Sequence, residues 1–447
     1  MEKDAILRLL QMSMQRIFAK LSNRPSAQKM LSNAAWMMGE QMIRLTAALL
    51  IGVWMARYLG PADFGRLNSA IAYAGIFAIF AKLGLDRIFV RELVEHAKDE
   101  LYASRFLAVM WTMRLTGAVV AYSAAVGVQW ISGWGDGWIV AIVSSQILFS
   151  VTDSIDLLFQ SRVNSKPVVM ARSLAFFATS GVKLVLLYFQ APLSSFVWVM
   201  LLDFAASSLA LVLIYHRHHL IKMRLAFEAS TSARLLQESW PEIFAGFSGL
   251  LLMRLDQVML RELDGPEAAG IFAVAARLSE AWYFVPMALI SSSFPAIVRI
   301  KTERPADYMR ELQKLMTMLV GLAYLVIAIV QFLAAPAIKF LYGASYAESA
   351  TILVIQIWCG LFMSLGLGSG SWIMAERKVR LNLFRNLIGA SVNVVLNLIL
   401  IPRYGAVGAA VATLTSLSVA YLVFDFVCRP MRPMAKIKLR SLILLRH

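Results

Sequence analysis

The segment from Arg254 to Pro295 reads RLDQVMLRELDGPEAAGIFAVAARLSEAWYFVPMALISSSFP, two apolar runs that are joined by a Gly-Pro turn. Both runs have the composition of membrane-crossing helices, yet each contains two charged residues. Arg254 and Asp256 lie in the first run, and Arg277 and Glu280 lie in the second. Because charged side chains are costly at membrane depth, they indicate a functional interior rather than a surface that faces lipid.

The turn of this segment has a counterpart earlier in the chain. Residues 55–65 (MARYLGPADFG) and 259–270 (MLRELDGPEAAG) share Met-x-Arg-x-Leu, then Gly-Pro, an acidic residue and a second glycine. Repeated halves are a common plan for membrane transporters, with the substrate site between the halves. The residues to which we assign a structural role in the turns are Gly60, Pro61, Gly65, Gly265, Pro266 and Gly270.

The composition places most of the chain in a bilayer. The 447 residues are 59% hydrophobic and 16% charged, with a formal net charge of +16, and about 20 apolar residues form one span. The excess of positive charge is explained by the orientation of the chain in the membrane and by contact with anionic lipid. Nucleic-acid binding is not predicted, because the sequence has no separate module rich in basic and aromatic residues. Cys359 and Cys428 lie in apolar runs, so neither a disulfide framework nor a metal site is predicted.

The apolar runs predict an all-α integral membrane protein with twelve transmembrane helices in two homologous six-helix lobes. Residues 4–21 have the spacing of an amphipathic helix on the membrane surface, although a disordered basic tail would explain them too. The predicted spans cover residues 32–58, 61–83, 101–131, 138–160, 167–189, 195–215, two runs within 235–295, 315–340, 347–375, 381–401 and 406–428. The predicted parts are an N-terminal segment (1–30), an N-lobe (31–217), a linker (218–233), a C-lobe (234–429) and a basic tail (430–447).

The distribution of Lys and Arg tests this span count through the positive-inside rule. With the N-terminus inside, most of the 43 Lys and Arg residues fall in the terminal segments and in the connectors that follow even-numbered spans. The turns on the opposite side hold Arg57, Arg66, Arg261, Lys339 and Arg403. With a wrong span count, connectors rich and poor in Lys and Arg would not alternate along the chain. We therefore predict that both termini are cytoplasmic.

Three arginines are predicted to lie near the middle of the membrane. Arg44 lies about 24 Å from the Gly60 turn at a helical rise of about 1.5 Å per residue. On the same basis Arg254 and Arg277 lie about 16 to 18 Å on either side of the Gly265 turn. In an apolar core about 30 Å thick, all three fall in the middle third. They would suit an anionic substrate, because Arg binds phosphate with a bidentate fork.

The alternative is that each arginine only neutralises a neighbouring acid. Glu40 and Arg44 are four residues apart, so they could meet on one helix face. Arg277 and Glu280, which are three residues apart, could do the same. Arg254 does not face the acid two positions further along its helix, so it needs another partner.

Acidic residues within the spans allow two readings. Asp153 and Asp156 share a face of the fourth span, where half-buried carboxylates could carry protons or sodium ions. Pairing with Arg114 or Lys183 for packing explains them equally well. The sequence leaves open whether transport is coupled to protons or to sodium, and it indicates no other cofactor. The candidates for ion coupling or charge pairing are Glu40, Asp153, Asp156, Asp256 and Glu280.

Motifs of soluble enzymes are absent from the sequence. There is no GxxxxGK[ST] phosphate loop, no HExxH zinc motif and no nucleophile elbow, so neither ATP hydrolysis nor hydrolytic catalysis is predicted. Gly366, Gly368 and Gly370 form GxGxG in the tenth span without a preceding strand, and close helix packing explains them better than a nucleotide site. We therefore predict a transporter with no catalytic residues.

Several motifs follow one another in order along the chain. They are ARYLGPADFGRLNSA and KLGLDRIFVREL in the first half, RLDQVML and GPEAAGIFAVAARLSEAW in the second, and NLILIPRYGAVGAAVAT near the end. Together they resemble the bacterial polysaccharide-biosynthesis flippases, the Wzx-type branch of the multidrug/oligosaccharidyl-lipid/polysaccharide (MOP) exporter superfamily. The resemblance covers about residues 30–428. One departure is QAPLSS at residues 190–195, which lacks the glycines of the corresponding turn in the second half.

The resemblance implies two lobes that form a V around a central cavity. It implies a flippase that moves an undecaprenyl-diphosphate-linked oligosaccharide across the bacterial inner membrane, for surface or exopolysaccharide biosynthesis. It also implies partners in the same pathway, such as polymerase and export proteins. Related peptidoglycan-precursor flippases have a cationic cavity, so we assign diphosphate binding to Arg44, Arg254 and Arg277.

Other functional classes share part of this architecture. A multidrug or cation antiporter of the same superfamily would favour acids over arginines in its cavity. A membrane-embedded polysaccharide polymerase or ligase would need a sizeable extracytoplasmic loop for its chemistry, whereas the predicted outer turns are short. A structural membrane scaffold would explain neither the repeat nor the charges within the spans.

Overall fold

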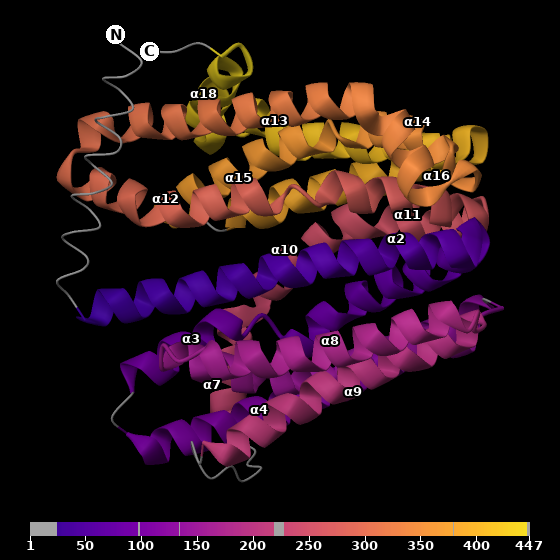
Figure 1. Cartoon of the computed structure of the whole chain (residues 1–447). Helices are drawn as coiled ribbons and strands as arrows, with labels where there is room; N and C mark the ends of the chain where they lie inside the picture. The colour runs from indigo at the N-terminus through magenta and orange to yellow at the C-terminus, as the bar shows by residue number, and fades with distance from the viewer. Residues whose placement is uncertain (1–24, 97–98, 134, 219–227, 379, 445–447) are drawn as a thin grey trace.

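The computed structural model describes residues 25–96, 99–133, 135–218, 228–378 and 380–444. These residues form helices and turns, and none of them lies in a β-strand (Figure 1). Within them, ten continuous helical runs are long and apolar enough to cross a membrane. Two of these runs contain a kink, at Gly60 and at Gly405, and each carries two spans. The twelve predicted spans are therefore confirmed.

The first half of the chain carries spans 1 to 6. Its elements are α2 (Pro25–Lys82), α3 (Asp86–Glu95), α4 (Glu100–Ser132), α5 (Gly137–Ser144), α6 (Gln146–Phe149), the 3-10 turn η1 (Ser150–Thr152), α7 (Asp153–Ser161), α8 (Lys166–Tyr188) and α9 (Leu193–Arg217). Spans 1 and 2 are the two parts of α2, and span 4 is assembled from the four elements α5 to α7. The predicted amphipathic helix of residues 4–21 lies outside the described residues.

The second half carries spans 7 to 12. Its elements are α10 (Ala229–Leu263), α11 (Pro266–Glu280), α12 (Phe284–Glu303), α13 (Pro305–Tyr342), η2 (Ala344–Tyr346), α14 (Glu348–Gln356), α15 (Cys359–Ala375), α16 (Arg380–Ser418), the π-helical turn η3 (Val419–Val423), α17 (Phe424–Val427), η4 (Arg429–Met431) and α18 (Arg432–Leu442). Spans 11 and 12 are the two parts of the run from α16 to α17. The basic tail contains α18, a helix that the sequence analysis did not predict.

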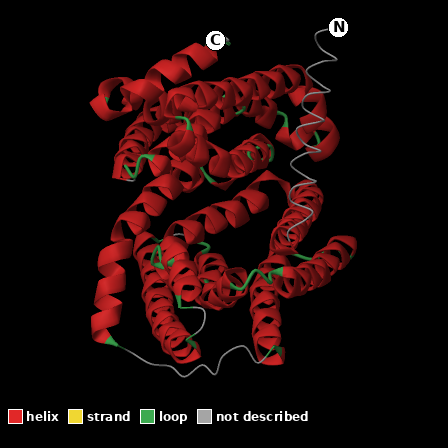
Figure 2. Cartoon of the chain, turned by 90° about the vertical axis from the view of Figure 1, so that its left-hand side faces the viewer, coloured by secondary structure: helices red, strands yellow, loops and turns green. Residues whose placement is uncertain are grey.

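The two halves form separate helical bundles, with α2 and α10 between them (Figure 1). Figure 2 views the molecule from the side of the chain termini and shows one bundle above the other. Helix α10 begins against the first bundle, where Leu235 packs in a core built from α3, α4 and α7. It ends in the second bundle, where it packs along α16. Helix α10 therefore holds the two lobes together.

The first glycines of the two Gly-Pro turns share one backbone conformation. Gly60 has φ 71° and ψ 173°, and Gly265 has φ 96° and ψ 173°. Positive φ favours glycine because it has no Cβ atom, and the proline that follows suits the first turn of the next helix. The repeated sequence therefore produces the same bend in both halves.

The second glycine of each repeat lies where the two halves cross. A Cβ atom at Gly65 would clash with the carbonyl oxygen of Pro266, and a Cβ atom at Gly270 would clash with that of Pro61. The contacts are reciprocal, as expected for halves that are related by a two-fold axis. Only residues without side chains allow two backbones to approach so closely. We call this side of the molecule the Gly-Pro end, and the opposite side the terminal end.

Further contacts between the halves reinforce the Gly-Pro end. Arg261 of α10 pairs with Asp136 of the first half at 2.5 Å, and the Tyr346 hydroxyl donates to the carbonyl oxygen of Ala56 at 2.9 Å. Apolar residues from both halves share one buried cluster here. In Figure 1 the molecule narrows towards this end, on the right, and widens towards the terminal end. The predicted V is therefore closed at the Gly-Pro turns.

Gly65→Ala is expected to destabilise the protein by about 1–3 kcal/mol, because the added methyl group must push the Pro266 backbone away. Gly75→Ala, on the same helix, is a matched control, because a Cβ atom there meets no atom within 4 Å. Thermal unfolding of the purified full-length variants in detergent measures the difference. Equal melting temperatures for the two variants would contradict the tight crossing.

Candidate functional site

A cavity of about 650 Å³ opens between α10, α12, α15 and α16 in the second half. Arg87 of α3 borders it and pairs with Glu242 of α10 at 3.5 Å, so both lobes contribute to its rim. The polar residues that line it are Arg87, Glu242, Ser291, Ser371, Asn382, Arg385, Asn386 and Tyr421. None of the three arginines assigned to diphosphate binding from the sequence lines this cavity.

Arg254 and Glu280 form a bidentate ion pair between α10 and α11. The Nη1–Oε1 distance is 3.2 Å and the Nη2–Oε2 distance is 3.0 Å. The suggested ion pair of Glu280 with Arg277 on the same helix is wrong, since the Glu280 carboxylate pairs with Arg254 of α10 instead. A bidentate contact is the stronger geometry for an arginine and a carboxylate. The expectation that Arg254 needs a partner beyond its own helix is confirmed.

Arg277 lies at the boundary between the lobes, against α2. Its Nη2 donates to Asn68 Oδ1 at 3.0 Å, and its guanidinium lies 5.4 Å from the centre of the Phe64 ring. It fills space that Gly52 leaves free. Within the described part of the chain, no carboxylate forms an ion pair with Arg277.

Arg44 pairs with Glu40 at 3.4 Å on α2, as the four-residue spacing suggested. The Arg44 side chain is 39% exposed, and Ser173 of α8 donates a further hydrogen bond to Glu40. No contact among the described residues joins Arg44 to Arg254 or Arg277. The structure therefore places Arg254 and Arg277 around Glu280 but does not add Arg44 to this group.

The acids of span 4 have a partner that the sequence analysis did not consider. Arg172 of α8 pairs with Asp153 at 2.6 Å and with Asp156 at 3.3 Å. The suggested partners, Arg114 and Lys183, pair with other acids. The turn between α7 and α8 lies about midway along the sequence between the two acids and Arg172. The three side chains therefore lie at a similar height on the two neighbouring helices. Both acids are therefore charge-paired.

Asp256 is 1% exposed and connects three helical segments. It accepts hydrogen bonds from Asn397 at 2.6 Å and from Thr413 at 2.5 Å. These two residues lie on opposite sides of the kink in α16 at Gly405. Asp256 therefore fixes both parts of α16 against α10, which gives it a structural role.

The sequence analysis overlooked Arg385, which is 4% exposed and lines the cavity. It lies four residues inside the predicted span 381–401, close to the connector that precedes this span. Asn382 and Asn386 flank it on the same stretch of α16 and also line the cavity. Three polar residues at one helical face of an apolar span form a pattern that could have identified the site.

A second overlooked feature is the ion pair between Lys438 of α18 and Asp425 of α17. The distance is 2.7 Å and both side chains are fully buried. The Lys438 ammonium also donates to the carbonyl oxygen of Tyr421, which lies in the π-helical turn η3. Burial lowers the pKa of Lys438 to about 8. This pair anchors the tail helix to span 12.

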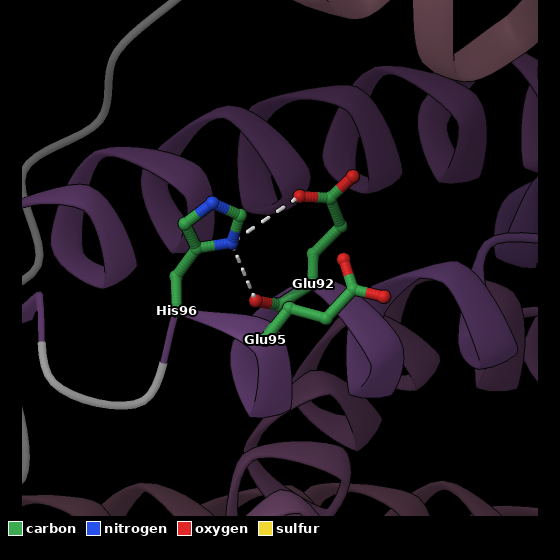
Figure 3. Close-up of side chains that lie close together, drawn as sticks. All are labelled: Glu92, Glu95 and His96. Atoms are coloured by element: carbon green, nitrogen blue, oxygen red, sulfur yellow. Dashed lines mark hydrogen bonds and ion pairs between the residues drawn. The ribbon is translucent and has the colours of Figure 1, made fainter.

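Glu92, Glu95 and His96 gather at the end of α3 (Figure 3). They are the one group of potential metal ligands within the described ranges. Arg91 lies 3.7 Å from Glu92 and 4.0 Å from Glu95, and Arg234 lies 3.8 Å from Glu92. The carboxylates are therefore engaged by two cations, which favours an ion-pair network over a metal site.

This network continues along α10. Arg91 pairs with Glu238 at 2.8 Å, and Arg87 pairs with Glu242 at 3.5 Å. The two arginines and the two glutamates are each four residues apart, so matching helix faces meet. The contacts hold α3 against the first part of α10, beside the cavity.

Comparisons with known proteins identify the family. The family described as "Polysaccharide biosynthesis protein" matches residues 30–301 of the chain. The chain belongs to this family. A relative within the curated proteins is the capsular polysaccharide biosynthesis protein CapF of Staphylococcus aureus, which is 22% identical over 404 residues. The match covers 89% of this chain and 98% of CapF.

Solved structures share the fold of this chain. The lipid II flippase MurJ, in an inward closed conformation, matches with a TM-score of 0.66 and 17% identity over 92% of this chain and 91% of MurJ. An inward-facing multidrug resistance transporter of the MATE family matches with a TM-score of 0.69 and 12% identity over 90% of this chain and 99% of its own. The predicted fold class and family are therefore confirmed.

Lys438→Met is expected to destabilise the protein by about 3–5 kcal/mol, because it leaves the buried carboxylate of Asp425 without a partner. The double variant Lys438→Met/Asp425→Leu should recover most of the loss, because it removes both charges together. Lys436→Met, at an exposed position of α18, is the matched control. Thermal unfolding in detergent distinguishes the variants, and a double variant no more stable than the single one would contradict the buried pair.

Proposed function

We propose that this chain is a flippase that carries an undecaprenyl-diphosphate-linked oligosaccharide across the bacterial inner membrane. The family supports a role in polysaccharide biosynthesis, and the fold is that of transporters. No covalent step is required, because the cargo only changes leaflets. The observation that carries the proposal is the charge of the group formed by Arg254, Arg277 and Glu280.

This group contains two arginines and one carboxylate. Glu280 forms its ion pair with Arg254, so no carboxylate among the described residues forms an ion pair with Arg277, which donates to the neutral amide of Asn68 instead. An uncompensated charge within the membrane is costly and persists where function requires it. A surplus cation at the boundary between lobes favours an anionic cargo such as a diphosphate. It argues against a cation antiporter, whose cavity would need a surplus of acids.

The mechanism follows from the closure of the V at the Gly-Pro end. With both termini in the cytoplasm, as the distribution of Lys and Arg predicts, the Gly-Pro end faces the periplasm. The diphosphate would enter from the terminal end and reach Arg277, while the prenyl chain stays in lipid. Outward opening would then separate Gly65 from Gly270 and Arg261 from Asp136 as the lobes rock. The proposal includes coupling of transport to protons or to sodium.

A strain that lacks this protein is expected to accumulate the lipid-linked oligosaccharide in the cytoplasmic leaflet, and the wild-type gene should reverse this. Arg277→Gln should lower transport about tenfold or more, because a hydrogen bond to a charged group contributes about 1.5–3 kcal/mol. Labelling the undecaprenyl-diphosphate pool and probing its leaflet measures both effects.

Arg299→Gln is the matched control, because the Arg299 side chain of α12 is 69% exposed and pairs only with a glutamate of its own helix. It should support normal transport. A normal leaflet distribution in the strain without the protein, together with altered drug or cation efflux, would replace the flippase by the antiporter. Normal transport by Arg277→Gln would remove Arg277 from the cargo site without affecting the flippase itself.

A further inference from the structure

Arg385 combines burial with access to the cavity of the second half. It is 4% exposed and lines the cavity between α10, α12, α15 and α16. Its Nη1 donates to Ser369 Oγ at 2.8 Å, and its Nη2 donates to the carbonyl oxygen of Gly366 at 3.1 Å. Its Nε is buried without a hydrogen-bond partner. The guanidinium therefore makes two hydrogen bonds, both to neutral acceptors, although it has five N–H donors.

The acids around Arg385 are ion-paired with other cations. No carboxylate of the described residues forms an ion pair with it. Asp425 of α17 attracts the Arg385 charge but is ion-paired with Lys438 at 2.7 Å. Glu242 of α10 lines the same cavity but is paired with Arg87 at 3.5 Å. Arg87, Lys438 and Arg385 therefore face two acids, and the cation without an ion-pair partner is Arg385. Removing one partner of a buried pair leaves a charge that costs several kcal/mol, so an anion in the cavity would be stabilised strongly.

The surroundings hold the guanidinium in place before any ligand arrives. The Tyr421 ring lies 4.9 Å from the Arg385 guanidinium carbon. Tyr421 is fixed at both ends, because its hydroxyl donates to Asn386 and its carbonyl oxygen accepts from Lys438. A Cβ atom at Gly366 would lie 2.7 Å from the Tyr421 ring, so the glycine of the GxGxG motif makes room for this arrangement.

The rest of the cavity lining suits a hydroxyl-rich head group. The buried Oδ1 of Asn382, one helical turn before Arg385, has no hydrogen-bond partner. Ser291 and Ser371 add hydroxyl groups from α12 and α15. The volume of about 650 Å³ falls within the usual range for sites that enclose small ligands. It fits a phosphate or an acidic sugar and is too small for a long prenyl chain.

We propose that Arg385 binds an anionic group of the cargo, a phosphate or a sugar carboxylate, in this cavity. The site is separate from the group around Glu280, none of whose members lines the cavity. The guanidinium supplies the charge, and the Ser291 hydroxyl can donate a hydrogen bond to an oxygen of the ligand. Asn382 Oδ1 and the Ser371 hydroxyl oxygen, whose own proton goes to the carbonyl oxygen of Gly368, can accept from hydroxyl groups of the ligand. The inference rests on the proposed function in that it takes the ligand to be part of the transported head group.

Calorimetric titration of the full-length protein in lipid nanodiscs tests this site, with sodium pyrophosphate and sodium glucuronate as separate probes at one ionic strength. Wild type should bind at least one of them. Arg385→Gln should weaken that binding tenfold or more, and Arg385→Lys should lose less, because it keeps the charge but not the bidentate fork. Arg403→Gln, at an exposed position of the same helix, should bind as wild type does.

The two probes separate the two sources of the anion. A loss confined to pyrophosphate assigns the site to the phosphates of the carrier lipid, and a loss confined to glucuronate assigns it to an acidic sugar. Equal affinity of wild type and Arg385→Gln for both probes would overturn the proposal. Absence of binding of either probe to wild type would overturn it too.

A second variant protects the test against loss of folding. Asn382→Asp keeps Arg385 but places a carboxylate three residues before it on α16, where the two can pair. It should weaken anion binding tenfold or more without lowering the melting temperature. Unchanged binding by Asn382→Asp would contradict the site even if Arg385→Gln failed to fold.

Failure of this inference is distinguishable from failure of the proposed function. Binding to the purified protein tests Arg385 alone, whereas the leaflet distribution in the strain without the protein tests the flippase. An Arg385→Gln protein that transports normally would leave the flippase in place and remove the site. A normal leaflet distribution, with anion binding that depends on Arg385, would do the reverse.

Discussion

The close contact of Gly65 and Gly270 with the backbone of the opposite lobe is the constraint on which the arrangement of the two lobes depends. Each glycine lies against the proline of the other repeat, so the same short motif supplies both the bend and the surface on which the bend packs. Lipid offers no hydrophobic driving force between helices, and close backbone packing replaces it. The lobes are therefore joined firmly at one end, and the cavity lies towards the other.

Most acids and bases within the spans belong to one of two groups, and Asp256, which is hydrogen-bonded to Asn397 and Thr413, belongs to neither. Asp153, Asp156 and Glu280 have arginine partners on neighbouring helices, which neutralise them and fix the helices. Arg277 and Arg385 donate hydrogen bonds to neutral groups and form no ion pair within the described residues. The first group explains packing without any ligand. The second leaves positive charge at two buried places, and an anionic cargo is the simplest physical reason to maintain both.

Most of the fold could be predicted from the sequence, because the length of apolar runs, the Gly-Pro repeats and the sidedness of Lys and Arg each limit the topology. The ion-pair partners of the charged residues could not be predicted from the sequence. Spacing along one helix allowed a pair between Arg277 and Glu280, but the carboxylate pairs with Arg254 of a neighbouring helix. The burial of Arg385 could not be predicted from the sequence either, because the residues that bury its side chain lie in α15 and in the π-helical turn η3, which are distant from it in sequence.

The positions of the two uncompensated arginines along the membrane give the proposed pathway a direction. Gly265 and Gly405 lie at the same end, since the Asp264 carboxylate reaches the Gly405 backbone. At about 1.5 Å per residue, Arg277 lies about 18 Å from Gly265, whereas Arg385 lies about 30 Å from Gly405. An anionic head group that enters from the terminal end would therefore meet Arg385 before Arg277. Arg277 contacts α2 of the opposite lobe, so binding of the head group to Arg277 would compete with a contact between the lobes. Binding to Arg385 would break no such contact, so it would precede the rocking motion without triggering it.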